Sequence, residues 1–116
     1  MNIGDEFLIT CKRNYFDKVT PSNAESKQKE GYKKLVSIAN EYFKGNKYGE
    51  FAGFLQEGQY FIQLWAAHLV LEYGIPDREL MLSALNLIKN YSDNPLAQEV
   101  ALEERKWLEA NMHKYG

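Results

Sequence analysis

The chain has 116 residues and a net charge of −2, and hydrophobic residues make up 45% of it. This length suits one domain spanning residues 1–116 and is too short for two, and an aromatic content of 14% excludes an intrinsically disordered chain. The slight acidic excess argues against a nucleic-acid-binding protein, because such proteins usually carry a basic excess.

The segment 2–19 is predicted to form a first helix. Its apolar residues recur at helical spacing and predict one buried face, made of Ile3, Phe7, Leu8, Cys11, Tyr15 and Val19. Because Cys11 is the only cysteine, no internal disulfide can form. We expect Cys11 to be a small buried hydrophobe and not a nucleophile, since both histidines lie far away in the sequence.

The sequence also bears on the cellular location of the protein. The acidic start of the chain does not resemble a signal peptide, and the longest apolar run, 64–71, is far shorter than the ~20 residues that cross a bilayer. We therefore expect a cytoplasmic protein that does not associate with a membrane.

The segment 21–44 is predicted to form a second helix. Ser22 and Glu25 have the spacing of a capping box at its start. The first two turns are polar, and whether residues 21–30 are ordered without a partner stays open. The closest approach to a basic cluster also lies here, but Glu25 and Glu30 interrupt it, so we expect a solvated helix face at Lys27, Lys29, Lys33 and Lys34.

Four further helical segments follow. A short helix is predicted at 48–57, where three glycines weaken it, and the most apolar segment, 59–73, is predicted to be the buried central helix. Two more helices are predicted at 76–91 and 94–113, the second capped by Asn94 with Pro95 in its first turn. Short polar breaks favour antiparallel neighbours, so we predict an all-α fold of about six helices stacked as antiparallel hairpins.

The sequence contains no convincing catalytic or cofactor motif. His68 and Glu72 are four residues apart on one predicted helix, and Glu104 is the one plausible further metal ligand. A buried, hydrogen-bonded histidine is the more common role for such a residue. The acidic residues of the last helix are expected to form a solvated face. We therefore expect no enzymatic activity, no cofactor and no metal.

The segment 62–71 carries a family resemblance. Ile62-Gln63-Leu64-Trp65-Ala66-Ala67, followed by Leu69 and Leu71, resembles the central helix of the domain of unknown function 2019 family. The segments 82–88 and 106–108 are similar to the family's following helices, so that the resemblance covers roughly residues 48–110. It implies a small bacterial HEAT-like α-α superhelix with no assigned activity, a kind of fold that usually presents a surface to a partner.

The leading functional hypothesis is a protein-interaction module, either an adaptor or an immunity-type protein that binds and blocks one partner. Its small size, mild acidity and surplus of tyrosine motivate this hypothesis. The expected partner-binding residues are Tyr48, Tyr60 and Gln63. The alternative is a small-ligand or metal-binding protein that uses His68 and Glu72, and a homodimer is a further state that the sequence leaves open.

Overall fold

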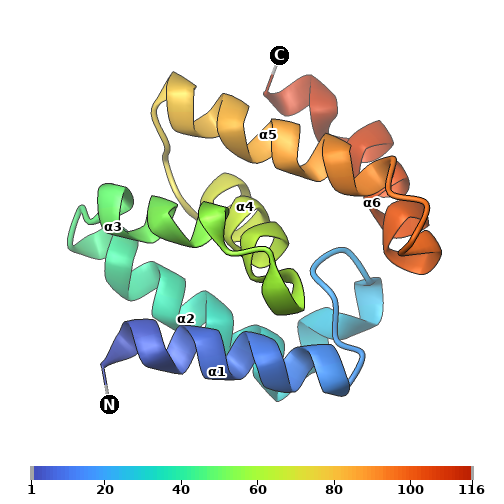
Figure 1. Cartoon of the computed structure of the whole chain (residues 1–116). Coiled ribbons are helices and arrows are strands. Elements are labelled where there is room, and N and C mark those ends of the chain that lie inside the picture. The colour runs from blue at the N-terminus through green and yellow to red at the C-terminus, as the bar shows by residue number, and fades with distance from the viewer. Residues whose placement is uncertain (1, 116) are drawn as a thin grey trace.

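The chain folds into α-helices joined by short turns, in a computed structural model that describes residues 2–115 (Figure 1). The α-helices are α1 Ile3–Phe16, α2 Glu30–Lys44, α3 Tyr48–Ala52, α4 Ile62–Tyr73, α5 Arg78–Ser92 and α6 Gln98–Asn111. Short 3₁₀ helices lie between or after them: η1 Ala24–Gln28, η2 Gly53–Gln56, η3 Gln59–Phe61 and η4 Met112–Lys114. Since residues 2–115 contain no strand, the prediction of an all-α fold with about six helices is confirmed.

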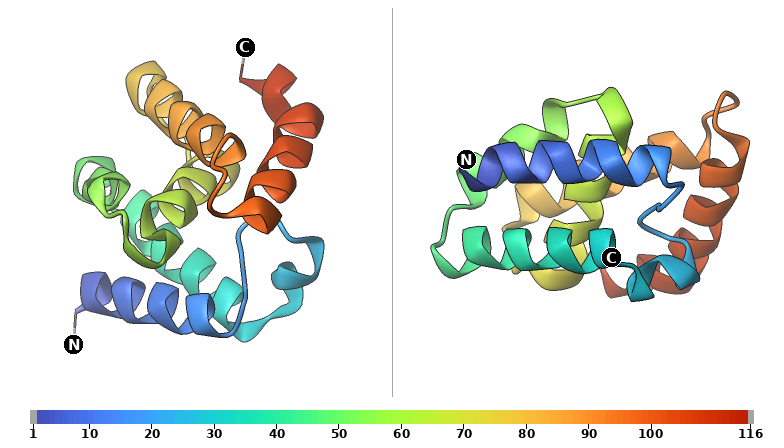
Figure 2. Two further views of the ribbon diagram at one scale, coloured as in Figure 1. Left: turned by 45° about the vertical axis from the view of Figure 1, so that its right-hand side comes forward. Right: turned by 90° about the horizontal axis from the view of Figure 1, so that it is seen from below.

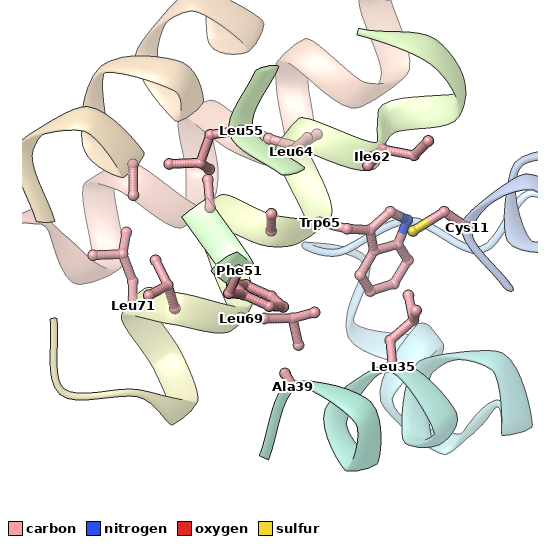
Figure 3. Close-up of a cluster of buried hydrophobic side chains, with 14 of the residues drawn as sticks. Cys11, Leu35, Ala39, Phe51, Leu55, Ile62, Leu64, Trp65, Leu69 and Leu71 are labelled. Atoms are coloured by element: carbon pink, nitrogen blue, oxygen red, sulfur yellow. The ribbon is translucent and has the colours of Figure 1, made fainter. Parts of the chain in front are cut away.

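Helix α4 lies at the centre of the molecule, as its apolar sequence predicts. Its residues 64–71 are all buried, and it packs against α1, α2 and α5. Figure 3 shows the indole of Trp65 pointing from α4 toward Cys11 of α1 and Leu35 of α2. Two layers therefore enclose α4: α1 and α2 lie on one side, and α5 and α6 lie on the other (Figures 1 and 2).

The first predicted helix is confirmed at its start and shortened at its end. The side chain of Asn2 caps α1 by accepting a hydrogen bond from the Asp5 amide at 2.8 Å, and Phe7 and Cys11 are fully buried. The expectation that Tyr15 is buried was wrong, because its relative solvent exposure is 44%. It lies in the last turn of α1, where its ring contacts those of Tyr60 and Phe61.

The predicted helix at 21–44 begins later than expected. Residues 21–22 form a turn, Asn23 instead of Ser22 caps the short η1, and α2 starts only at Glu30. The Ser22 hydroxyl hydrogen-bonds His68 at 3.0 Å, so it is not available as a helix cap. Thr20 and Asn23 both donate to Glu103 of α6, so tertiary hydrogen bonds hold this segment in a non-helical path.

The last predicted helix also begins later, at Gln98 instead of Asn94. The Asn94 side chain accepts a hydrogen bond from the amide of Leu96 at 2.9 Å, which forms a local turn in place of a helix cap. The expectation of a solvated acidic face on this helix was wrong for Glu104, which is fully buried. Within residues 2–115, none of the helices has the length and apolar character needed to cross a bilayer.

Candidate functional site

A long groove runs beside α5 and is bounded on its other side by α3, η2 and the turn before α4. It consists of three adjoining hollows of about 680, 440 and 450 Å³. Gln63 and Asn90 line both the first and the second hollow, and Tyr91 and Asn94 line both the second and the third. We call these three adjoining hollows together the α5 groove.

The first hollow of the α5 groove is lined by amide and hydroxyl side chains from both of its walls. Gln56 and Gln63 come from one wall, and Ser83, Asn86 and Asn90 come from α5. Each amide side chain offers both a donor and an acceptor. Leu80 and Leu87 line the same hollow. The wall can therefore pair with the backbone of an extended peptide and contact its apolar side chains.

The charged side chains that line the α5 groove among the described residues are acidic, although Lys12 places its Nζ 5.5 Å from the centroid of the Tyr60 ring at the aromatic end. Asp77 and Glu79 lie at the end near α3, and Asp93 lies in the middle hollow. No lysine or arginine between residues 2 and 115 lines the three hollows. Since these acids attract cations and desolvated like charges repel, the groove favours a basic ligand over an acidic one.

The far end of the α5 groove is aromatic. The ring of Tyr60 lies 5.5 Å from that of Tyr15 and 6.0 Å from that of Phe16, and Phe61 packs edge-on against Tyr91 at 6.0 Å. Phe16 is 66% exposed, so a large apolar face borders the groove without a covering segment among residues 2–115. Exposed aromatic clusters of this kind are enriched at protein interfaces.

The backbone that carries this aromatic end is strained. Tyr60 and Phe61 have φ values of 51° and 57°, in the left-handed region that residues other than glycine seldom adopt. Aromatic contacts hold both rings, and the Gln63 amide donates to the carbonyl of Glu57 across the turn at 3.0 Å. Such strain persists only where the surrounding structure over-determines it, and it is concentrated at functional sites.

The three residues expected to bind a partner all line the α5 groove. Tyr48 lies at the acidic end, where it stacks on Phe43 at 4.9 Å and its hydroxyl accepts a hydrogen bond from the Ile75 amide. Gln63 lies in the middle and donates to the Tyr91 hydroxyl at 2.9 Å, and Tyr60 lies at the aromatic end. Tyr48 and Gln63 share the first hollow, whereas Tyr60 lines the third, and their role in binding a partner stays a prediction.

Sequence reasoning missed the contribution of α5 to this groove. Ser83, Asn86 and Asn90 recur at spacings of three and four residues, which places them on one helix face. That pattern was a readable signal. A polar face on a helix predicts exposure, however, and only the packing of α5 against α4 determines that this face borders a groove.

A second cluster of polar groups surrounds His68, which is buried in the interior. Its Nδ1 lies 2.9 Å from Oε2 of Glu72, and its Nε2 lies 2.5 Å from Oε1 of Glu104. The Ser22 hydroxyl is 3.0 Å from the same Nε2, and Trp107 packs edge-on against the ring at 4.6 Å. The sequence singled out His68, Glu72 and Glu104 as one possible set, and the structure brings the three together.

The two carboxylates determine the charge of the imidazole. Burial by itself lowers the pKa of His68, but the hydrogen bonds that its ring donates to Glu104 and Glu72, together with the charges of these carboxylates, outweigh burial and raise the pKa to about 9. At neutral pH the ring is therefore an imidazolium that donates both of its protons to carboxylates. Ser22, His68 and Glu72 have the order of a hydrolase triad, but Nε2 carries a proton held by Glu104 and cannot accept one from Ser22.

The arrangement also differs from a metal site. A metal-bound imidazole must direct one ring nitrogen's lone pair at the ion, whereas both ring nitrogens of His68 are directed at carboxylate oxygens. Among the residues that the structure describes, no three His, Cys, Asp or Glu side chains are grouped to hold a metal. A separate cavity of about 490 Å³ lies beside the cluster and is lined by Glu72, Trp107 and Tyr115.

Comparisons with known proteins add no identification. No family model, no curated protein and no solved structure matches the chain. The resemblance to the domain of unknown function 2019 family therefore stays a prediction from the sequence.

Proposed function

We propose that the protein is a protein-interaction module, of the adaptor or immunity type, that binds an extended basic segment of a partner protein in the α5 groove. The observation that carries this proposal is the lining of the first two hollows: a row of amides with acids as the only charged lining groups among the described residues. Amides bond a peptide backbone, and acids select basic side chains along it.

The rigidity of the groove supports the same function. Tyr60 is held by its ring contacts and its turn, and Gln63 is fixed by its bond to Tyr91. A partner segment would therefore bind a surface that needs little ordering, which lowers the entropic cost of association. The proposal includes no catalytic step, and it places the protein in the cytoplasm with its partner.

The proposal is tested by native co-purification of the tagged chain from its own host at low salt, followed by binding measurements with the purified partner. We expect one near-stoichiometric partner whose affinity falls by about tenfold or more when Glu79 is changed to Lys, because the variant places a cation in an acidic groove. The matched control is Glu109→Lys, which makes the same charge change at an exposed position of α6 outside the groove.

Two further variants probe the polar and aromatic parts. Asn90→Ala and Tyr60→Ala should each lower the affinity for the partner. Gln98→Ala, a change at an exposed position outside the groove, should leave the affinity unchanged. The proposal fails if the partner binds Glu79→Lys, Asn90→Ala and wild type equally well. It also fails if the purified partner contacts the chain through acidic segments only.

The cavity beside Glu72 supports a second proposal, a small-ligand site. Glu72 is only partly buried, and the rings of Trp107 and Tyr115 lie nearly parallel at 6.1 Å next to it. If the chain purifies without any partner, thermal-shift screening of metals and metabolites tests this site. A hit that Glu72→Gln abolishes would support it, and unaltered melting temperatures throughout the screen would reject it.

A further inference from the structure

The cavity beside the His68 cluster has walls from three parts of the chain. Its volume of about 490 Å³ lies within the range of about 300–1,000 Å³ that is usual for small-molecule sites. The segment 21–27 after α1 forms one wall, the end of α4 forms the second, and the end of α6 with η4 forms the third. None of its lining residues also lines the α5 groove, so the two sites are separate. We call it the Glu72 cavity.

Hydrogen bonds between distant segments hold these walls in place. Thr20 and Asn23 both donate to the carboxylate of Glu103 on α6, at 2.7 and 3.0 Å, so the segment after α1 is fixed to α6 (Figure 2). At the other end of the chain, the hydroxyl of Tyr115 donates to the carbonyl of Leu71 at 3.2 Å. The Glu72 cavity is therefore preformed, and a ligand that enters it needs to order little of the chain.

The carboxylate of Glu72 has one oxygen engaged and one free. Oε2 lies 2.9 Å from Nδ1 of His68, whereas Oε1 has no hydrogen-bond partner within residues 2–115. Oε1 is not among the buried atoms that lack a partner, and the side chain is 20% exposed, so this oxygen is accessible. Among the hollows described above, Glu72 lines only this cavity, which places its acceptor within reach of a ligand there.

His68 does not neutralise Glu72 completely. Its imidazolium is shared between Glu72 and Glu104, so the three groups carry a net charge of −1, counting one cation against two carboxylates. Glu104 is 0% exposed and cannot meet a ligand, so the excess negative charge is accessible only at Glu72. An ammonium group at Oε1 would balance this charge through a charge-assisted hydrogen bond.

The other two walls each contribute a lysine to the same cavity. Lys27 comes from η1 and Lys114 from η4, and neither forms a salt bridge with a carboxylate of the described chain. Asn111, which also lines the cavity, accepts a hydrogen bond from Nζ of Lys114 at 2.9 Å and so holds this cation in place. A purely cationic ligand would be repelled by both lysines, and a purely anionic one by Glu72. The cavity therefore favours a ligand that carries both charges.

Aromatic rings from α6 and the end of the chain complete the lining. Trp107 and Tyr115 are partly buried, and their rings lie 6.1 Å apart at an angle of 18°. Trp107 also packs edge-on against His68 at 4.6 Å, so the aromatic surface adjoins the charged cluster. An apolar group in contact with these rings is removed from water, which favours binding.

We propose that the Glu72 cavity binds a free α-amino acid with an apolar side chain. Its ammonium group donates to Oε1 of Glu72, and its carboxylate binds Lys27 and Lys114. Its side chain packs against Trp107 and Tyr115. This inference rests on the proposal of a small-ligand site beside Glu72 and names the chemistry of that ligand, and it is independent of peptide binding in the α5 groove.

The test titrates the whole chain with L-leucine and with two compounds that each lack one of its charges. 4-Methylpentanoate has no ammonium group, and 3-methylbutylamine has no carboxylate. The indole N–H signal of Trp107 in NMR spectra follows binding, and that of Trp65, which is buried where α4 meets α1 and α2, is the internal control. We expect a saturable shift of the Trp107 signal with leucine, and an affinity lower by about tenfold or more for each of the other two compounds.

The outcomes separate this inference from the proposal on which it rests. If 4-methylpentanoate or 3-methylbutylamine binds as tightly as leucine, the assignment to an amino acid is overturned. The same holds if leucine leaves the Trp107 signal unchanged while another metabolite shifts it, and in both cases the small-ligand site itself stands. If no metal or metabolite in the screen shifts this signal, the small-ligand site and the amino-acid assignment both fail.

Matched variants decide whether the two charges belong to this cavity. Lys27→Gln combined with Lys114→Gln should weaken leucine binding by about tenfold or more and should not weaken binding of 3-methylbutylamine, which has no carboxylate. The control combines Lys33→Gln with Lys106→Gln, two exposed positions outside the cavity, and should change neither affinity. Glu72→Gln should also weaken leucine binding by about tenfold or more. Equal leucine affinities for the two lysine double variants would overturn the proposal even if Glu72→Gln does not fold.

Discussion

Nε2 of His68 lies 2.5 Å from Oε1 of Glu104, and this contact joins the central helix to the last helix in the interior of the protein. Neither side chain is significantly exposed, at 2% and 0%. Glu72 holds the opposite ring nitrogen, so one imidazolium is shared between two carboxylates. Because Ser22 also contacts Nε2, the same histidine anchors the segment that connects α1 to α2.

Removing Glu104 should destabilise the fold strongly. Glu104→Ala leaves a buried imidazolium with one carboxylate and opens a void, and we expect the free energy of unfolding to fall by about 3–5 kcal/mol. Glu104→Gln keeps the volume and one acceptor and should cost less. Urea denaturation measures both, with Glu109→Ala as the exposed control on α6, for which we expect a change within about 0.5 kcal/mol. Equal stabilities for Glu104→Ala and Glu109→Ala would contradict this role.

The His68 cluster should also make stability depend on pH above neutrality. The pKa of His68 is raised from 6.5 to about 9 in the folded state. Below pH 6.5 both folded and unfolded chains hold the proton, and the full stabilisation is present. Between 6.5 and 9 only the folded chain holds it, so the free energy of unfolding should fall by about 1.4 kcal/mol per pH unit from this group. Above 9 this contribution is lost.

Denaturation of the wild type and of His68→Gln across this pH range measures the effect, and the variant should lose the slope. The groups that face the imidazole are Glu72, Glu104, Ser22 and Trp107, from α4, α6 and the loop after α1. If His68→Gln does not fold, the imidazole carbon-proton signals of the wild type report the titration directly. A folded-state midpoint for His68 at or below 6.5 would show that the carboxylates do not hold the proton.

The sequence predicted the helices well because their periodic apolar residues determine which faces are buried. It failed where a side chain has a distant partner. Ser22 has the local signature of a helix cap, but His68, 46 residues later, takes its hydroxyl. Tyr60 and Gln63 could be selected as polar or half-buried residues near a turn. The groove that they line with Asn86 and Asn90 depends on how α5 packs, which no local pattern specifies.

Gly31 is required because Asn14 occupies the position of its missing side chain. In an isolated helix, alanine would be more favourable than glycine by about 1 kcal/mol. Here a Cβ would lie 1.8 Å from Oδ1 and 2.8 Å from Cγ of a buried asparagine, so Gly31→Ala should instead destabilise the protein, by about 1–3 kcal/mol.

A double-mutant cycle checks the cause of that loss. In an Asn14→Ala background the obstruction is gone, and Gly31→Ala should become neutral or stabilising. A stabilising Gly31→Ala in the wild-type background would mean that α1 and α2 do not approach as closely as described.

The left-handed backbone at Tyr60 gives a prediction whose sign differs from that of ordinary helix positions. Tyr60→Gly and Tyr60→Ala both remove the ring and its contacts with Tyr15 and Phe16, so their difference isolates the backbone. At a φ of 51° glycine avoids the clash between Cβ and the carbonyl, and Tyr60→Gly should be the more stable variant by about 1 kcal/mol.

Lys89, exposed within α5, provides the opposite case, and there the alanine variant should be more stable than the glycine variant by about 1 kcal/mol. Thermal or urea denaturation of the four variants gives both differences. If alanine is preferred at both positions, the turn does not hold Tyr60 in the left-handed region, and the aromatic end of the α5 groove is not preformed.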